Sequence, residues 1–424
     1  WDSRLRFFSA ERGKNFRKVW SHDALVEAYS GGLGKSIRAY LNSDENPSFI
    51  LPYRATEFIE ALSEESSGCI SILSNPVGLK KRLDDKIAFV TEAERLGLRT
   101  PEGEIIEVKG IEKGLLGKWG SPLVVRERIG SSGNQTHLIK TPEELEALKV
   151  VLVNKLGGQE PVIVCRFVTG PSVGATGIVY EGKARMSHSS VIVSGLAGSS
   201  MHRFSYAGSD YTAYHRLPES SRRNIEEATL AIGNWAGSFG YRGIYGVDFV
   251  VHEGKAYTLE LNPRLLGTTQ LLTELELRAG ASPATAFWHI AEYLSLKTTE
   301  EEVSGAFREL GALRLEGFQL VLRNTSNRPV QIGRSMEPGI YEISSGVPRH
   351  IRKGNRIADL VGPAEFLITS SPPEKGKILY PRSVLFKVEG LETLFDEAVE
   401  NLMPYVSNWV ECFSKAAELV ELPG

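Results

Sequence analysis

The sequence of 424 residues lacks most of the features that mark a specialised class of protein. Its three cysteines, Cys69, Cys165 and Cys412, are far apart and odd in number, which favours neither a disulfide framework nor a zinc site. We therefore expect a cytoplasmic protein in a reducing compartment. No stretch approaches the roughly 18 consecutive apolar residues that a membrane helix needs, so we expect no membrane association. The sequence starts at Trp1, which leaves open what precedes it.

An excess of charge of one sign is also missing. The formal net charge is -3, and lysine and arginine form no long block, so we expect no nucleic-acid partner. Apolar residues make up 42% and charged residues 24% of the chain, which is typical of an ordinary globular protein. A chain of this length has room for about two to four domains.

A complete phosphate-binding P-loop is missing as well. The stretch GGLGKS at 31–36 ends as a P-loop does, but Tyr29 stands where the pattern needs its first glycine. The residues before it, SHDALVEAY, favour a helix capped by Ser21 and not the strand that a P-loop requires. We therefore predict that these glycines end a helix and that Lys35 takes no part in nucleotide binding.

The front of the chain has a strand–helix–strand pattern. Residues 48–53 and 70–74 are predicted strands, and 54–65 is a predicted helix between them, which favours a small parallel sheet. The next helix is capped by Asp84 or Asp85.

The middle of the chain alternates strands with one well-marked helix. Thr141, Pro142 and Glu144 form a capping box that opens a helix ending at Leu156. Strands are predicted at 121–128, at 161–168 and in two segments joined by a turn at Glu181-Gly182. Residues 195–217 lack periodicity and are predicted to be a long loop of the kind that often covers a binding site.

The rest of the chain gives weaker signals. We predict a helix containing Ile225 and Ile232, a hairpin at 245–264, and helices near 271–279 and 283–295. A charged link at 297–304 is predicted to follow. After it we predict short strands and a last helix from about 391 that bends at Pro404.

The hairpin carries the most informative polar residues. Glu260 and Asn262 are two apart on one strand and share a face, and Asp248 lies on the preceding strand. A three-residue loop or a bulge would place Asp248 directly opposite Glu260, whereas a plain two-residue turn would place it opposite Leu259. Two carboxylates and an amide oxygen suit Mg²⁺ that phosphate oxygens also hold. The competing explanation is a solvated hairpin with its charged residues facing water.

Other candidates lie on separate elements. Arg264 follows the hairpin and could neutralise charge on a phosphoryl or acyl group. Arg126 precedes the turn Gly130-Ser131-Ser132-Gly133, whose backbone N–H groups could cover phosphates. Phe167 and Val168 could form an apolar wall at the end of a strand. The histidines His188, His202 and His215 are better explained as core or loop residues than as catalytic bases.

Four stretches, in this order, resemble the characteristic parts of the ATP-grasp superfamily. They read LDDKIAFVTEAERLGLRTP, SPLVVRERIGSSGN, VIVCRFVTGPS and VDFVVHEGKAYTLELNPR, and the resemblance covers about residues 75–295. Its most specific part is E-x-N-P-R with an aspartate twelve residues before the glutamate. The DDK…GLRTP and TGPS stretches resemble D-alanine–D-alanine ligase, and ELNPR is similar to biotin carboxylase and purine-pathway members.

The resemblance implies the place of each ligand. ATP would lie between two α+β subdomains, and one or two Mg²⁺ ions (or Mn²⁺) would be held by Asp248, Glu260 and Asn262. Phosphates would contact Lys86, Arg126 and the turn Gly130, Ser131, Ser132 and Gly133. The adenine and ribose would contact Arg166, Phe167, Val168 and Ser172. Arg264 and Arg242 are the implied catalytic residues.

Two positions depart from the family pattern. Arg126 stands where the family usually has lysine, and its planar fork implies a different phosphate geometry. Ser172 stands where a glutamate commonly contacts the ribose, so Glu160 or another acid could serve instead.

The fold class implied is α/β and α+β. We expect an N-terminal parallel-sheet domain at 1–110, a two-subdomain ATP-grasp fold at 111–300, and a β-rich C-terminal domain at 301–424 that ends in a helix.

The reaction implied joins a carboxylate to an amine through an acylphosphate and releases ADP and phosphate. Arg203, Tyr206, Tyr211 and Arg242 could hold a carboxylate, which hints at an amino acid or small peptide. The alternatives are an ATP-grasp carboxylase, a phosphotransferase, or a nucleotide-binding regulatory protein without catalysis. We expect small-molecule carboxylate and amine substrates and consider a homodimer; the identity of the substrates stays open.

Overall fold

A computed structural model describes residues 31–41, 48–65, 70–130, 133, 135–200, 202–369 and 372–422. The chain divides after Lys80 into two compact units. Among the described residues, no helix has both the length and the apolar character needed to cross a bilayer.

The first unit contains the expected strand–helix–strand pattern. Its described elements are α2 (Gly32–Leu41), β1 (Ser48–Ile50), α3 (Glu57–Glu65) and β2 (Ile70–Ile72), and α4 (Val77–Leu83) crosses into the second unit. Strands β1 and β2 pair in parallel, with Phe49 opposite Ser71. The prediction that the glycines of GGLGKS end a helix is wrong, because α2 begins at Gly32 and contains Lys35. Ser21 and Tyr29 lie outside the described residues.

The second unit starts with α5 (Lys86–Arg95) and a four-stranded antiparallel sheet. The sheet has the order β3 (Gly103–Glu107), β6 (Pro161–Arg166), β4 (Leu123–Glu127) and β5 (Thr136–Ile139). A core that includes Leu145 and Leu152 joins α7 (Pro142–Leu156) to this sheet and to α6 (Gly114–Trp119). Thr141 caps α7 by accepting a hydrogen bond from the Glu144 N–H, as predicted. The Glu144 carboxylate accepts from the Lys140 N–H, one residue before the cap.

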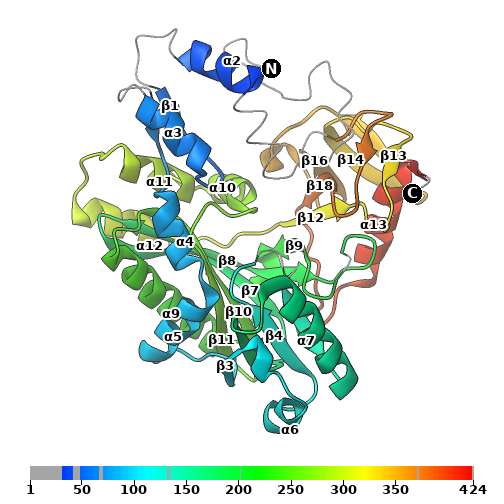
Figure 1. The fold of residues 1–424 in the computed structure, drawn as a ribbon. Helices are drawn as coiled ribbons and strands as arrows, with labels where there is room; N and C mark the ends of the chain where they lie inside the picture. Colours follow the sequence, from blue (N-terminus) through cyan, green and yellow to red (C-terminus); the bar gives the residue numbers. More distant parts are fainter. Residues whose placement is uncertain are drawn as a thin grey trace. The chain divides into compact units, whose positions relative to one another are not determined.

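A ten-stranded antiparallel sheet forms the centre of the second unit (Figure 1). Its order is β11 (Lys255–Asn262), β10 (Gly243–His252), β7 (Ser172–Tyr180), β8 (Lys183–Ser194), β9 (Tyr206–Asp210), β12 (Phe318–Arg323), β18 (Val384–Gly390), β16 (Glu365–Ile368), β14 (Gly339–Ser344) and β15 (Val347–Arg352).

Helices cover both faces of this sheet. Gly233 and Gly237 of α9 (Glu219–Ser238) approach Tyr245 and Val179. Neighbouring residues along these strands, Ile178 and Ile244, point the other way. They pack against Trp288 of α11 (Thr285–Tyr293) and Phe307 of α12 (Glu300–Ala312). The predicted charged link at 297–304 is therefore wrong, since Thr299 and Glu302 form a capping box that opens α12.

The predicted loop at 195–217 is wrong from Tyr206 onwards. It contains β9 and the short helix α8 (Tyr211–Tyr214). Strand β9 pairs with β8 on one side and with β12, which is about a hundred residues away in the chain, on the other. Such a strand depends on distant partners, and this one has no periodic pattern of its own. Asp210, which is fully buried, caps α8 and accepts hydrogen bonds from the backbone of Leu394 and the hydroxyl of Thr393.

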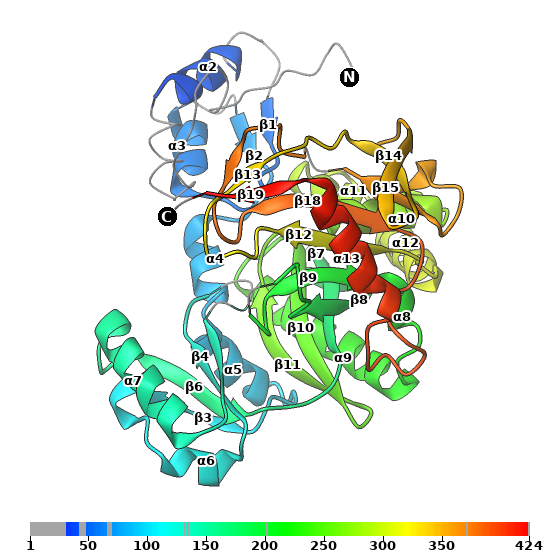
Figure 2. The ribbon, with the colours of Figure 1, turned by 90° about the vertical axis from the view of Figure 1, so that its right-hand side faces the viewer.

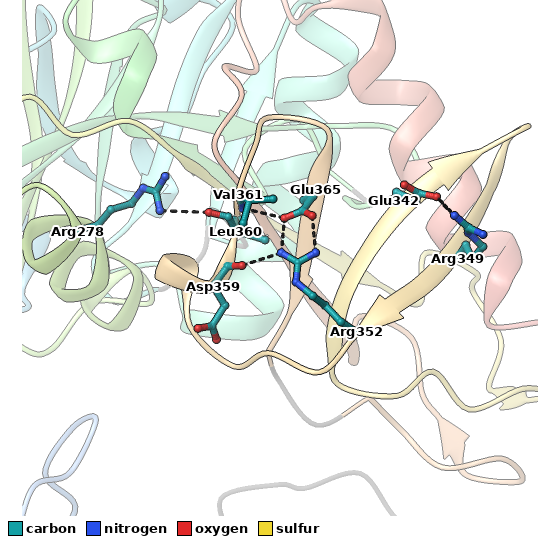
Figure 3. Close-up of polar contacts among 8 residues, drawn as sticks. All are labelled: Arg278, Glu342, Arg349, Arg352, Asp359, Leu360, Val361 and Glu365. Atoms are coloured by element: carbon teal, nitrogen blue, oxygen red, sulfur yellow. Dashed lines mark hydrogen bonds and ion pairs between the residues drawn. The ribbon is translucent and has the colours of Figure 1, made fainter.

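The C-terminal residues continue the central sheet through β12, β18, β16, β14 and β15 (Figure 2). They pack against α10 (Thr269–Arg278), whose Arg278 donates to the Leu360 carbonyl at 3.3 Å. Figure 3 shows this contact beside Glu365, which accepts from Arg352 at 2.7 Å and from the Val361 N–H at 2.8 Å. These bonds tie the loop after β15 to both α10 and β16.

The end of the chain differs from its prediction. Helix α13 (Pro404–Ala416) begins at Pro404 instead of bending there, because proline needs no partner for its nitrogen in the first helical turn. Strand β19 (Leu419–Glu421) follows α13 and pairs with β13 (Val330–Ile332), which also pairs with β17 (Ile378–Leu379).

The predicted domain limits at residues 110 and 300 stay a prediction. Residues 81–110 belong to the second compact unit, because β3 pairs with β6. Residues after 300 share a sheet with residues before it, because β12 pairs with β9.

Candidate functional site

The hairpin of β10 and β11 brings Asp248 opposite Glu260. The turn holds two residues, Glu253 and Gly254, with φ of 48° and 74°, as in a type I′ turn. The three-residue loop is therefore absent, but the alternative bulge is present. Phe249 pairs with Thr258 and Asp248 pairs with Glu260, so Leu259 is the extra residue. The bulge produces the pairing that the turn alone would not.

The amide and guanidinium groups that follow Glu260 complete one side of this acid pair. Asn262 donates from Nδ2 to Asp248 Oδ2 at 3.3 Å, and Arg264 donates from Nη2 to Asn262 Oδ1 at 3.0 Å. Burial and the neighbouring charge of Glu260 raise the pKa of Asp248 above its ordinary value. Two half-buried acids face each other here, and a cation between them would relieve their repulsion.

Two buried cations approach the acid pair from the other sheet and from α5. Lys86 Nζ lies 3.1 Å from Glu260 Oε2, and Arg126 Nη2 lies 3.5 Å from the same oxygen. The side chains of Lys86 and Arg126 are 8% and 7% exposed. Burial would raise the pKa of Glu260, but Lys86 and Arg126 hold it below its ordinary value. Arg126 also donates to the carbonyl of the bulged Leu259 at 2.9 Å.

Local sequence explains where these cations lie. Lys86 is the first residue of α5, and Asp85 caps that helix by accepting from the N–H groups of Ile87 and Ala88. Arg128 donates to Asp85 at 2.7 Å and so ties the cap to the end of β4. The helix start and the strand that carries Arg126 are thereby held side by side.

The glycine turn lies next to Lys86. Lys86 Nζ donates to the Gly130 carbonyl at 2.8 Å. Gly133 has φ of 74°, and a Cβ there would lie 2.1 Å from the Phe204 carbonyl oxygen, so only glycine fits. Ser131 and Ser132 lie outside the described residues.

Two residues lie beside the predicted adenine wall: Phe204, which the sequence did not indicate, and Arg203, which was expected to hold a carboxylate instead. Phe167, which is half-buried, meets Phe204 edge to face with 6.4 Å between ring centroids. The Arg203 guanidinium lies over the Phe167 ring at 5.1 Å. Arg203 and Phe204 belong to a segment without periodicity, and only the fold places them beside Phe167. Val168 is half-buried as well, and Arg166 is exposed and lies 3.8 Å from Glu102.

The two ribose candidates lie apart. Ser172 begins β7 close to Phe167 in the chain and pairs with Val250. Glu160 precedes β6, whereas Phe167 follows it, so roughly 20 Å of strand separates them.

Arg242 is not brought to the acid pair. It donates from Nε to Glu292 Oε1 at 2.9 Å, and its guanidinium lies 4.8 Å from the Tyr293 ring centre. It comes six residues before Asp248 along β10, which corresponds to roughly 20 Å. Its catalytic role stays a prediction that the geometry does not support.

The oxygen ligands fit a magnesium–nucleotide complex better than a metal held by protein alone. No group of three or more His, Cys, Asp or Glu side chains among the described residues could hold a metal ion. Asp248, Glu260 and the Asn262 amide are hard oxygen ligands, and Mg²⁺ usually completes such a set with phosphate oxygens and water.

Comparison with known families agrees with this geometry. Residues 83–268 match the family described as ATP-grasp domain. This range includes Arg126 from the four-stranded sheet and Asp248 and Glu260 from the ten-stranded sheet. This part of the chain is an ATP-grasp domain, and the resemblance drawn from the sequence is confirmed.

Particular relatives are more distant. The carbamoyl phosphate synthase large chain of Deinococcus deserti is 24% identical over 246 residues, which is 56% of this chain but only 23% of that protein. The chain therefore spans about a quarter of that relative. The biotin carboxylase domain of the Hydrogenobacter thermophilus 2-oxoglutarate carboxylase, solved with MgADP and bicarbonate, is 16% identical, with a TM-score of 0.54 over 86% of this chain and 75% of that one.

A protein described as a ligase is also among the structural neighbours. Phosphoribosylamine–glycine ligase from Thermotoga maritima is 14% identical, with a TM-score of 0.51 over 82% of this chain and 79% of that one. At these identities the likeness establishes the fold.

Proposed function

We propose that this protein is an ATP-dependent ligase that joins a carboxylate to an amine. One observation carries the proposal: within the ATP-grasp domain, Asp248 and Glu260 face each other, and Lys86 and Arg126 converge on one oxygen of Glu260. Oxygen ligands beside a pair of buried cations suit the polyphosphate of a nucleotide and its magnesium.

The residues divide the work between binding and charge. Asp248, Glu260 and Asn262 would hold Mg²⁺, which when bound neutralises phosphate charge. Lys86 and Arg126 orient the outer phosphates, with the Gly130–Gly133 turn over them. Phe167 and Val168 line the adenine, and Ser172 is the nearer of the ribose candidates. Mn²⁺ could replace Mg²⁺ at the same ligands.

The chemistry follows from the weakness of a carboxylate as an electrophile. A carboxylate oxygen attacks the γ-phosphorus of ATP, the bond to the β-phosphate oxygen breaks, and an acylphosphate and ADP result. The amine then attacks the carbonyl carbon, phosphate leaves, and the nitrogen loses a proton. Arg264, held at Asn262, stabilises the oxyanion of the tetrahedral intermediate.

Product analysis distinguishes this proposal from its alternatives. ATP is incubated with panels of amino acids and small peptides, and ADP, AMP and phosphate are measured. The ligase requires ADP release that depends on both a carboxylate and an amine. A carboxylase requires bicarbonate instead, and no segment of this chain resembles a biotin-carrier lysine motif. Nucleotide binding without turnover on any panel would favour a regulatory protein.

Two further proposals concern assembly and substrates. The small-molecule substrates are an amino acid or small peptide on the carboxylate side and an amine. A homodimer is proposed as the assembly, and light scattering after gel filtration measures it.

A further inference from the structure

A second polar cavity lies at the edge of β8. Its volume is about 460 Å³, within the range of small-molecule sites. Strand β9 pairs only with Val191–Ser194 of β8, and no other described strand covers that edge at Met186–Ser189. Side chains from α8, the start of α9 and the end of α12 surround the cavity.

A bulge in the β7–β8 hairpin presents His188 to this cavity. Gly177 pairs with Met186 and Ala175 pairs with Ser189, so two residues, Ser187 and His188, stand opposite the single residue between. The cavity is distinct from the acid pair. Ser190, which follows the lining residue Ser189, pairs with Gly174, and Gly174 pairs with Asp248. Two strand spacings, about 10 Å, therefore separate Ser190 from Asp248.

His188 is a buried histidine with one unpaired ring nitrogen among the described residues. It is 7% exposed, and its Nε2 has no partner within hydrogen-bonding distance. Its nearest acid, Glu276, is 3.7 Å away and already accepts from Ser187 and from the Thr285 N–H. Buried polar atoms of this kind are rare, and a ligand is one of the few explanations for them.

The rest of the lining supplies positive charge. Arg222 of α9 and Arg314 after α12 both line the cavity, and their charges help lower the pKa of His215, although burial lowers it most. Arg223 is paired with Glu219 at 3.2 Å, which leaves Glu226 as the remaining acid of the lining. Arg314 lies 3.7 Å from Glu316, which is outside the lining. The lining itself therefore holds three guanidinium groups against two carboxylates, with two imidazoles and the Tyr214 hydroxyl beside them.

We infer that this cavity binds a small dianion, either a dicarboxylate or inorganic phosphate, between Arg222, Arg314 and His188. Guanidinium groups bind carboxylate and phosphate oxygens in pairs, and the neutral imidazole of His188 lines the cavity beside them. The site is separate from the nucleotide site, because none of its residues belongs to that site, although Tyr211, which the sequence suggested as a carboxylate-binding residue, lies in its lining.

Isothermal titration calorimetry on the full chain tests this inference. Succinate and inorganic phosphate are titrated separately, each with and without saturating MgATP. We expect one of them to bind with a Kd of about 1 mM or tighter, whether or not MgATP is present. Stronger binding of succinate identifies a dicarboxylate site, and stronger binding of phosphate identifies a phosphate site.

Variants locate the binding. Arg222→Gln and Arg314→Gln should each weaken it at least about tenfold, since each removes a charge-assisted pair of hydrogen bonds. Arg349→Gln, which makes the same charge change on β15, should leave it unchanged, as should Glu260→Gln. Arg314 is exposed, so its variant is informative even if Arg222→Gln fails to fold.

Three results would overturn the inference. The first is that neither anion binds the wild type at about 10 mM. The second is that both arginine variants bind the anion with wild-type affinity. The third is that MgATP competes with the anion in the wild type but not in Glu260→Gln. The last would assign the anion to the nucleotide site and would leave the proposed ligase function intact.

Discussion

The two neighbouring hairpins of the central sheet have the same turn and different chemistry. Both turns are Glu-Gly followed by lysine, and Glu181 and Glu253 share a φ of 48° as Gly182 and Gly254 share one of 74°. Each hairpin has one extra residue in its second strand, a few positions after the turn. In β10–β11 this bulge aligns two acids beside two cations, and in β7–β8 it presents a neutral histidine beside arginines.

The difference shows what a bulge does in a sheet. A two-residue turn sets which residues pair, and one extra residue resets the pairing for everything beyond it. The residues beyond each bulge can then be polar and functional, while those nearer the turn keep packing against the helices. The β7–β8 hairpin is predicted to attract an anion, and the β10–β11 hairpin is predicted to attract a cation with its nucleotide.

The largest expected effect is on the acid pair. Glu260→Gln should lower ATP turnover by at least about a hundredfold, the scale for loss of one electrostatic contact with the transition state. Steady-state ADP release with a supporting carboxylate and amine measures it. Glu342→Gln on β14 is the matched control, because it makes the same change far from the site. Normal turnover in Glu260→Gln would place the reaction elsewhere.

The same variant should also lose stability. If only the repulsion between the acids mattered, Glu260→Gln would leave the stability of the nucleotide-free protein unchanged or slightly higher. Lys86 and Arg126, however, both form ion pairs with Glu260. Removing its charge leaves two buried cations poorly paired, so the free energy of unfolding should fall by about 1–3 kcal/mol. Urea unfolding of both glutamine variants checks this, and a gain of stability would contradict the described contacts.

The histidine of the other hairpin should make stability depend on pH. Burial, together with His215, lowers the pKa of His188 to about 4. The unfolded chain then binds the proton more readily, so stability is full above pH 6.5 and falls as pH drops toward 4. The loss between pH 8 and pH 5 should be about 2 kcal/mol.

Comparison with His188→Gln isolates this contribution. Glu389 acts in the opposite sense, because burial raises its pKa to about 7, and it is unchanged in both proteins. The unfolding free energy of the wild type minus that of His188→Gln should fall by about 2 kcal/mol as the pH drops from 8 to 5. A difference independent of pH would mean that His188 is not held neutral.

The two turns should respond equally to substitution. Gly182→Ala and Gly254→Ala should each lower the free energy of unfolding by about 1 kcal/mol, because both have φ of 74°. No atom closer than 3.4 Å opposes the new methyl group at either position, so the backbone term dominates. Thermal unfolding of the pair measures it, and unequal losses would show that the turns differ in more than their surroundings.

The smallest expected effect is at Lys35. Lys35→Ala should leave MgATP affinity unchanged within about twofold, because Lys35 lies inside helix α2. A large loss of affinity in equilibrium binding would restore the P-loop interpretation of GGLGKS.

Local signals account for what the sequence predicted well. Thr141, Pro142 and Gly157 predicted both ends of α7. The pairing of Asp248 with Glu260 was expected if the hairpin contained a bulge, and it does. The failures lie where structure depends on distant partners. Strand β9 exists because β8 and β12 flank it, and Arg242 pairs with Glu292, fifty residues along the chain. Neither contact leaves a periodic pattern or a spacing that a sequence could reveal.

The magnesium dependence of nucleotide affinity tests the central claim most directly. ATP is titrated into the wild type and Asp248→Asn, with Mg²⁺ and with EDTA. If the bulge aligns Asp248 and Glu260 for magnesium, Mg²⁺ should strengthen ATP binding to the wild type at least about tenfold, and Asp248→Asn should lose that gain while keeping its affinity in EDTA. An equal gain from Mg²⁺ in both proteins would contradict the account.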